Sequence, residues 1–270
     1  MNAEDRQRTI VREHFRETST TWGSRYAARP AKMSDMDLVL RRENVHRLMR
    51  PLIAASGERL RVLDLGCGTG DVLDGLSRES IHVTGTDIVH EMVVAAATAH
   101  PLDRFLVCDA LRLPIAPASM DVVTCLGVVE YIPEPQTVLR QVVDVLRPGG
   151  FAIISLPNRA SLFRKLSRIE VAAESGLSAM VRRVRGQTPI ERTSKYAHRQ
   201  WSLRAGEQLL AASGLTVCDV RFNTYGLWGR LGRWPISLSL SKWLSRRFNA
   251  RSPLSSACAC TMVFLGQKAT

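Results

Sequence analysis

The chain has 270 residues and a formal net charge of +12. Hydrophobic residues make up 45% of it, which is enough to build a core and excludes a wholly disordered chain. The charge is unevenly distributed: residues 60–158 carry 6 basic and 12 acidic side chains, whereas residues 159–252 carry 18 and 5. No nucleic-acid recognition motif accompanies this basic block, so a nucleic-acid partner is not expected.

The sequence also argues against a membrane-spanning protein, a secreted protein and a zinc-binding protein. No apolar run reaches the roughly 18–20 residues of a membrane-spanning helix, and the polar start of the chain does not resemble a secretory signal. The six cysteines are scattered, which is typical of structural thiols in a reducing cytoplasm. Cys258 and Cys260 are expected on one face of a strand, and no second Cys or His pair at zinc spacing accompanies them. No metal site is therefore expected.

Apolar patterning predicts strands and helices that alternate along the middle of the chain. Short apolar runs bounded by turn residues predict strands at 61–65, 81–86, 105–108, 121–126, 151–156, 215–222 and 256–267. Helical periodicity and stop signals predict helices within 5–56, at 69–79, 89–100 and 135–146, within 159–200, and at 202–213. This alternation predicts an α/β fold with a parallel sheet covered on both faces, and a ligand crevice at the carboxyl ends of the strands.

The most informative motif is Val62-Leu-Asp-Leu-Gly-Cys-Gly-Thr-Gly70, which joins the first predicted strand to the next element. Gly66, Gly68 and Gly70 allow the backbone to approach a ligand closely, because no Cβ intrudes. Their spacing differs from the G-x-G-x-x-G of a dinucleotide site. A pyrophosphate prefers a helix N-terminus without a nearby carboxylate, so Asp64 at the strand end favours a cationic or amino-bearing ligand.

This stretch resembles motif I of the class I S-adenosylmethionine-dependent methyltransferases, and further motifs follow in the family's order. Thr84-Gly-Thr-Asp87 resembles the segment whose acid accepts hydrogen bonds from both ribose hydroxyls. Residues 108–114 resemble the segment whose acid pairs with the adenine amine, which is Asp109 here. Residues 121–133 resemble the strand that lines the methionine and acceptor pocket, and 146–150 resemble the turn before the fifth strand.

The resemblance implies a Rossmann-like, doubly wound, mostly parallel seven-stranded sheet with S-adenosyl-L-methionine as cofactor. It also implies four regions: a helical N-terminal lid, a cofactor-binding core, a basic cap inserted after the fifth strand, and a C-terminal part of the sheet that contains a Trp/Arg-rich insertion. Their expected bounds are 1–58, 59–158, 159–201 and 202–270, with the insertion at 225–252.

In related small-molecule enzymes, including those acting on quinone precursors, porphyrins and polyketides, the leading helix folds over the cofactor. Phe15, Trp22 and Tyr26 fall on one helical face at spacings of 7 and 4, which fits either this role or simple core packing. The residues expected to bind the cofactor are therefore Asp64, Gly66, Cys67, Gly68, Gly70, Asp87, Ile88, Asp109, Ala110, Leu126, Tyr26 and Trp22.

Catalytic residues are less certain from sequence, because methyl transfer needs a general base only if the acceptor atom carries a proton. The candidates near the expected pocket are Glu130, Tyr131 and His198. Residues 127–131 lack the Asn/Asp-Pro-Pro-aromatic segment of enzymes that methylate amino groups of DNA bases, and Cys125 reads as core rather than as a nucleophile. The sequence does not distinguish O-, N- and C-methylation.

The region Tyr225-Gly-Leu-Trp…Arg-Arg-Phe248 contains three of the five tryptophans and several Arg and Lys residues, with no acid. This composition fits a peripheral membrane interface on the cytoplasmic side, or a solvated basic face over a hydrophobic cap. The sequence thus predicts a cytoplasmic methyltransferase for a hydrophobic or lipid-like small molecule, with an anionic membrane surface as an expected partner. The alternatives are a soluble specialised metabolite as acceptor, an RNA methyltransferase, or a non-catalytic S-adenosylmethionine-binding module.

Overall fold

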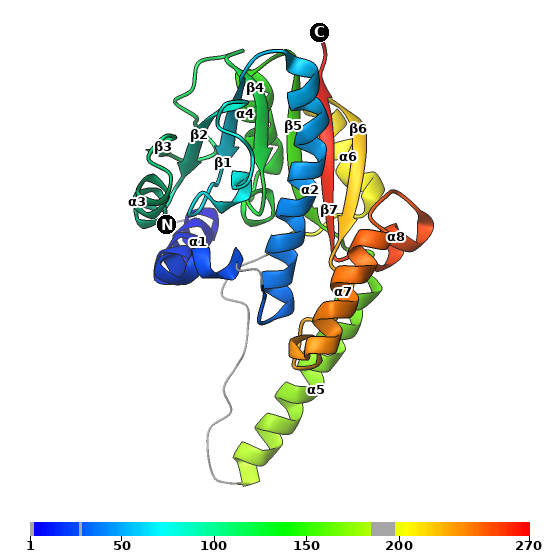
Figure 1. The fold of residues 1–270 in the computed structure, drawn as a ribbon. Coiled ribbons are helices and arrows are strands. Elements are labelled where there is room, and N and C mark those ends of the chain that lie inside the picture. Colours follow the sequence, from blue (N-terminus) through cyan, green and yellow to red (C-terminus); the bar gives the residue numbers. More distant parts are fainter. Residues whose placement is uncertain (1–2, 27–28, 185–197) are drawn as a thin grey trace.

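The computed structural model describes residues 3–26, 29–184 and 198–270 and contains the expected seven-stranded sheet (Figure 1). Its order is β3-β2-β1-β4-β5-β7-β6. The first five strands pair in parallel, and β7 lies antiparallel between β5 and β6. The strands are β1 Leu60–Leu65, β2 Ile81–Asp87, β3 Arg104–Val107, β4 Met120–Cys125, β5 Leu146–Pro157, β6 Leu215–Asn223 and β7 Thr261–Lys268.

Helices cover both faces of this sheet, as the near-continuous apolar strands require. On one face, α2 packs Val45 and Leu48 against Val62 of β1; on the other, α4 and α6 enclose Leu63, the next residue of the same strand. The doubly wound arrangement is therefore confirmed. The helices are α1 Ala3–Trp22, α2 Met33–Ser56, α3 His90–Ala99, α4 Pro135–Val145, α5 Leu162–Val184, α6 Leu203–Ala211, α7 Pro235–Arg247 and α8 Pro253–Cys258.

The helix predicted at 69–79 is wrong. Only a short 3-10 turn forms there, at Asp71–Leu73. Gly70 and Gly75 adopt φ angles of +86° and +83°, in the left-handed region, and such residues interrupt a right-handed helix on either side of the turn. The glycine loop is thus followed by an irregular connection to β2.

The start of the last strand is also corrected. Residues 256–258, expected to begin that strand, belong to α8, whose amino end is capped by Ser252 through a hydrogen bond from the Ser255 amide. The strand begins only at Thr261. Cys258 and Cys260 therefore do not share one face of a strand: Cys258 ends a helix, and Cys260 is buried just before β7.

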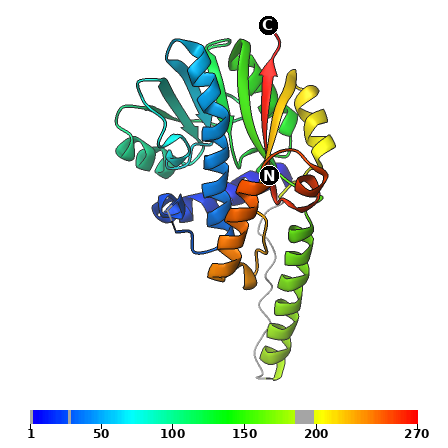
Figure 2. The same ribbon diagram turned by 45° about the vertical axis from the view of Figure 1, so that its right-hand side comes forward.

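Helices α1, α5 and α7 lie beyond the carboxyl ends of the parallel strands. Helix α1 crosses this end of the sheet, while α5 and α7 extend away from it (Figures 1 and 2). Within the part of the chain that the structure describes, no helix is both long and apolar enough to cross a membrane. The four-region division, including the cap at 159–201, stays a prediction, and residues 185–197 of that cap fall outside the described ranges.

Candidate cofactor and acceptor site

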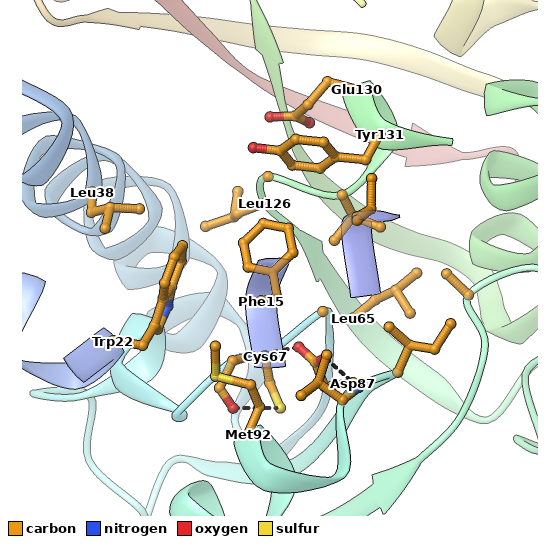
Figure 3. Close-up of a pocket in the computed structure, with 18 of the residues that line it drawn as sticks. Phe15, Trp22, Leu38, Leu65, Cys67, Asp87, Met92, Leu126, Glu130 and Tyr131 are labelled. Carbon is orange, nitrogen blue, oxygen red and sulfur yellow. Dashed lines mark hydrogen bonds between the residues drawn. The ribbon is translucent and has the colours of Figure 1, made fainter. Parts of the chain in front are cut away.

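A cavity of about 340 Å³ opens where the carboxyl ends of β1, β2, β4 and β5 meet. Helices α1 and α2 close it from the other side, and the first turn of α5 reaches it. In Figure 3, Asp87, Cys67 and Met92 lie at one end, Glu130 and Tyr131 at the other, and Phe15 between them. The two ends differ in chemistry and are described in turn.

The glycine loop after β1 brings bare backbone to the first end. Gly66 and Gly68 have φ angles of +73° and +54°, which disfavour any residue with a side chain. A Cβ on Gly66 would lie 2.2 Å from Val128, and one on Gly68 would lie 3.0 Å from the Trp22 ring. The Gly66 and Cys67 amides both donate to the Thr86 carbonyl, which fixes the loop against β2.

Asp87 ends β2 beside this loop. One carboxylate oxygen accepts from the Gly68 amide at 3.0 Å and the other from the Val89 amide at 2.9 Å. Burial raises the pKa of Asp87, while these amide donors work in the opposite direction. Each oxygen has a further lone pair, so the positioned carboxylate can still accept two hydrogen bonds from a vicinal diol.

Asp109 and Ala110 lie beyond Asp87 on the same cavity wall, together with Ile88. Asp109 accepts from the Leu111 amide at 2.9 Å, which holds its turn, and lies 3.6 Å from Arg8 of α1. An acid fixed in this way can meet an adenine amine. The ion pair between Arg8 and Asp109 thus connects helix α1 to this side of the cavity.

Aromatic residues of the N-terminal region form the opposite wall. The Phe15 and Trp22 rings meet edge to face at 5.3 Å, and Phe15 contacts Tyr131 in the same manner at 5.4 Å. Tyr26 lies in the turn after α1, and burial raises the pKa of its hydroxyl. All three line the cavity, but they do not share one helical face as predicted, because α1 ends at Trp22 and Tyr26 belongs to the 3-10 turn Gly23–Tyr26.

The second end of the cavity contains the three candidate catalytic side chains. Glu130 is 3% exposed, and one of its carboxylate oxygens, Oε2, is buried without a hydrogen-bond partner among the described residues. His198 Nε2 lies 3.9 Å from the other oxygen, and the Tyr131 and His198 rings meet at 5.2 Å. The Arg199 amide donates to the Glu130 carbonyl, which holds residues 198–199 against the turn after β4.

Burial shifts both titratable partners toward their neutral forms. It raises the pKa of Glu130 to about 7, although the charges of Arg41 and Arg164 act against it. It lowers the pKa of His198 to about 4, and the same two arginines add to that shift. His198 is therefore uncharged at neutral pH, and the pair is not an ion pair there. Glu130 can gain or lose a proton near neutrality, as a general base must.

Sequence reasoning missed Arg41, which lines this end from α2. Its Nη2 lies 2.9 Å from Asp37 Oδ2, and its Nε is buried without a partner among the described residues. Thr224 and Thr261 donate to the other oxygen of Asp37. These residues lie far apart in the chain, and charged residues are common along α2, so no local pattern singles out Arg41.

Comparisons with known proteins agree with this geometry. Residues 63–154 match the family described as a methyltransferase domain. The ubiquinone biosynthesis O-methyltransferase of Pseudomonas aeruginosa (strain UCBPP-PA14) is 31% identical over 165 residues, which cover 58% of this chain and 68% of that protein. The chain belongs to the class I S-adenosylmethionine-dependent methyltransferases.

Other relatives of this methyltransferase align over a shorter span. The ubiquinone biosynthesis O-methyltransferase of Aeromonas salmonicida (strain A449) is 35% identical over 105 residues, or 37% of this chain and 44% of that protein. The alignment thus covers less than half of that relative. Among solved structures, the magnesium protoporphyrin IX methyltransferase of Synechocystis PCC 6803 with bound SAH has a TM-score of 0.63 at 17% identity. It covers 97% of this chain and 100% of that one, which supports the fold.

The residues of this methyltransferase fit S-adenosylmethionine at the first end of the cavity. The side-chain-free loop, the two-oxygen acceptor of Asp87 and the acid at Asp109 are the groups that a nucleoside with an amino-acid tail requires. The predicted residues that line the cavity are Trp22, Tyr26, Gly66, Cys67, Gly68, Asp87, Ile88, Asp109, Ala110 and Leu126. Their roles toward the cofactor stay predictions.

Two predicted residues lie outside the cavity lining. Asp64 is 3% exposed and accepts a 2.6 Å hydrogen bond from Thr124, and burial raises its pKa to about 6. A Cβ on Gly70 would lie 2.6 Å from His100, so this glycine permits close packing of the loop against α3 and its C-terminal residue. Both residues therefore stabilise the glycine loop from the side that faces away from the cavity.

Proposed function

We propose that this methyltransferase transfers a methyl group to a hydroxyl oxygen of a hydrophobic small molecule, with Glu130 as the general base. The observation that carries the proposal is the buried carboxyl of Glu130, whose Oε2 has no partner among the described residues and whose pKa is about 7. A hydroxyl acceptor must lose its proton as it is methylated, and a base is most effective when its pKa is near the working pH. The activity of the relatives, O-methylation in ubiquinone biosynthesis, supports the same reaction class.

The chain's own residues would divide the work between the two cavity ends. When bound, S-adenosylmethionine supplies an electrophilic methyl group. Asp87 and the glycine loop would hold and orient the nucleoside, while Phe15 and Tyr131, which line the path between the two ends, would shield it from water. Glu130 then holds the proton that the acceptor hydroxyl gives up.

The test is methyl transfer from labelled S-adenosylmethionine to catechol-type acceptors, with products identified by mass spectrometry. Glu130→Gln should lower kcat by about 10²-fold or more while leaving cofactor affinity unchanged. The wild-type rate should rise with pH through about 7 and then level off, since only the ionised carboxyl is a base. Glu134→Gln is the matched control, because Glu134 lies four residues away and outside the cavity lining. Full activity of Glu130→Gln would refute the assignment.

The second part of the proposal concerns the surface at which the enzyme would encounter its acceptor. Helix α7 buries polar side chains and exposes apolar ones, the reverse of an ordinary surface helix. Ser241 and Ser245 are buried and accept hydrogen bonds from the Tyr225 and Thr224 amides, respectively. Its exposed side presents three apolar residues at spacings of 4 and 3, which places them on one helical face. These residues are Ile236, Leu240 and Trp243, which are 74%, 53% and 59% exposed.

We infer that this face contacts an anionic lipid surface. Residues 225–252 contain six basic side chains and no acid, and Trp234 adjoins the same face at 59% exposure. Tryptophan and arginine together suit the headgroup region of a membrane, and the cation-rich surround selects anionic lipid over a second copy of this basic protein. A lipid-like acceptor could then enter from the bilayer.

Vesicle co-sedimentation tests this second part. The chain should bind phosphatidylglycerol-containing vesicles at low salt, and binding should fall at least about tenfold in a Trp234→Ser/Trp243→Ser double variant. Leu102→Ser is the control, because Leu102 is also exposed but lies beside β3. Equal binding by all three proteins, or no binding to anionic vesicles, would refute the contact between α7 and a lipid surface. The assignment of methyl transfer would not be affected.

A further inference from the structure

Arg164 brings a second guanidinium to the acceptor end of the cavity. It lies in the first turn of α5 and lines the cavity with Trp228. Its Nε donates to the Cys260 carbonyl at 2.8 Å, and its guanidinium carbon lies 4.9 Å from the centre of the Trp228 ring. The group is therefore held in place by one hydrogen bond and one aromatic face, and its two terminal nitrogens remain available for a ligand.

The charges at this end do not cancel. Arg41 is matched by Asp37 at 2.9 Å. His198 is neutral at neutral pH, and Glu130 is ionised only in part there because of its raised pKa. No carboxylate lies within 4.0 Å of the Arg164 guanidinium in the part of the chain that the structure describes. Arg164 thus lines this end of the cavity without an acidic partner of its own among those residues.

The position of Arg164 on its helix points in the same direction. A cation in the first turn of an α-helix meets the partial positive charge of the helix N-terminus, which disfavours it. A ligand anion placed there would satisfy both the guanidinium and the helix end. The Trp228 ring and the Cys260 carbonyl account for one face and one nitrogen of the guanidinium, and neither contact supplies an anion for its charge.

We propose that Arg164 binds a carboxylate of the methyl acceptor, so that the enzyme's substrates are hydroxylated aromatic or lipid-like acids rather than neutral phenols. This inference rests on the proposed function, since it assigns the second end of the cavity to the acceptor. A planar carboxylate matches the two free nitrogens of the guanidinium, while Trp228 packs against the guanidinium face. Glu130 would then receive the proton of a hydroxyl elsewhere on the same molecule.

The experiment uses two probes that share a ring and differ in one group: 3,4-dihydroxybenzoate and 4-methylcatechol. Each is titrated calorimetrically at about pH 7 into the full chain saturated with S-adenosylhomocysteine, which has no methyl group to transfer. The wild type should bind the benzoate about tenfold to a hundredfold more tightly, the effect expected of one charge-assisted pair. Arg164→Gln should remove this preference and leave the affinity for 4-methylcatechol unchanged. Arg164→Lys should keep part of it.

Arg168→Gln is the matched control, since Arg168 lies one turn further along α5, outside the cavity lining, and bonds Gln200. It should retain the full preference. Equal affinity of the wild type for both probes, no binding of either probe, or an unchanged preference in Arg164→Gln would overturn the proposal. A methylation assay separates this outcome from failure of the proposed function: carboxylate binding without product would refute only the transfer reaction, and product from both probes at equal affinity would refute only the Arg164 assignment.

Discussion

Replacing Glu130 by Gln should make the protein more stable at alkaline pH. The folded protein holds this carboxyl at a pKa of about 7 against an ordinary value of 4.5, because burial disfavours its charged form. A group whose pKa is raised by folding supports stability below its unfolded pKa, and this support is lost as the pH rises through its folded pKa. Above about pH 7, ionisation of Glu130 therefore costs the fold free energy.

The magnitude follows from the two pKa values. The step from 4.5 to about 7 corresponds to about 3 kcal/mol at pH 8, when the carboxyl is ionised in both states. A neutral Gln escapes this cost, although its amide must find partners in the same place, which reduces the gain to about 2 kcal/mol. At about pH 4 the carboxyl is largely protonated in both states, so only the penalty of the Gln amide remains and Glu130→Gln should be about 1 kcal/mol less stable than the wild type.

Urea unfolding at about pH 8, 6 and 4 measures this difference directly. The stability advantage of Glu130→Gln should shrink steadily as the pH falls. The control Glu134→Gln, which changes an acid near the amino end of α4, should show no such pH-dependent gain. This prediction would be refuted by a Glu130→Gln protein that is less stable than the wild type at pH 8, or whose stability advantage does not depend on pH. Either outcome would mean that burial does not raise the pKa of Glu130.

Three further predictions concern the loop, the ribose site and the sheet. Asp87→Ala should weaken S-adenosylmethionine binding by about 10²-fold in calorimetry with little loss of stability; unchanged affinity would remove the ribose assignment. Gly66→Ala should cost about 2 kcal/mol or more in urea unfolding, because φ is +73° and the new Cβ would meet Val128, and wild-type stability would contradict the loop geometry. Asp121→Asn should destabilise the protein by about 1–2 kcal/mol at neutral pH, and this loss should shrink as the pH falls below the ordinary value of 3.8, because burial, which raises the pKa of Asp121, is outweighed by the hydrogen bonds from Arg61 and the charges of Arg147 and Arg61, which lower it; a loss that does not depend on pH would exclude this cause.

The sequence was most informative where the evidence is local. The strand, glycine loop and acid of residues 62–87 are adjacent in sequence and in space, so their arrangement could be predicted from pattern alone. The helix predicted at 69–79 failed because periodicity does not reveal that Gly75 adopts a positive φ. The last strand is predicted to begin at residue 256, which is too early. The apolar run there suits a helix or a strand, and it follows Ser252 and Pro253, which cap and begin α8.

The acceptor end could not have been assembled from sequence. Glu130 and His198 were candidates, but their buried environment depends on Arg41 and Arg164, which come from helices far away in the chain. Nor does the sequence show that Ser241 of α7 faces inward while its apolar neighbours face outward. These features arise from tertiary packing, which overrides the local pattern.

One cavity should bind S-adenosylmethionine at Asp87 and keep Glu130 at a separate acceptor end. Calorimetric titration of S-adenosylmethionine into wild type, Asp87→Ala and Glu130→Gln tests it most directly. The wild type should show saturable one-to-one binding, Asp87→Ala should lose about 10²-fold in affinity, and Glu130→Gln should retain the full affinity. Absence of binding to the wild type, or equal weakening in both variants, would contradict the division of the cavity into a cofactor end and an acceptor end.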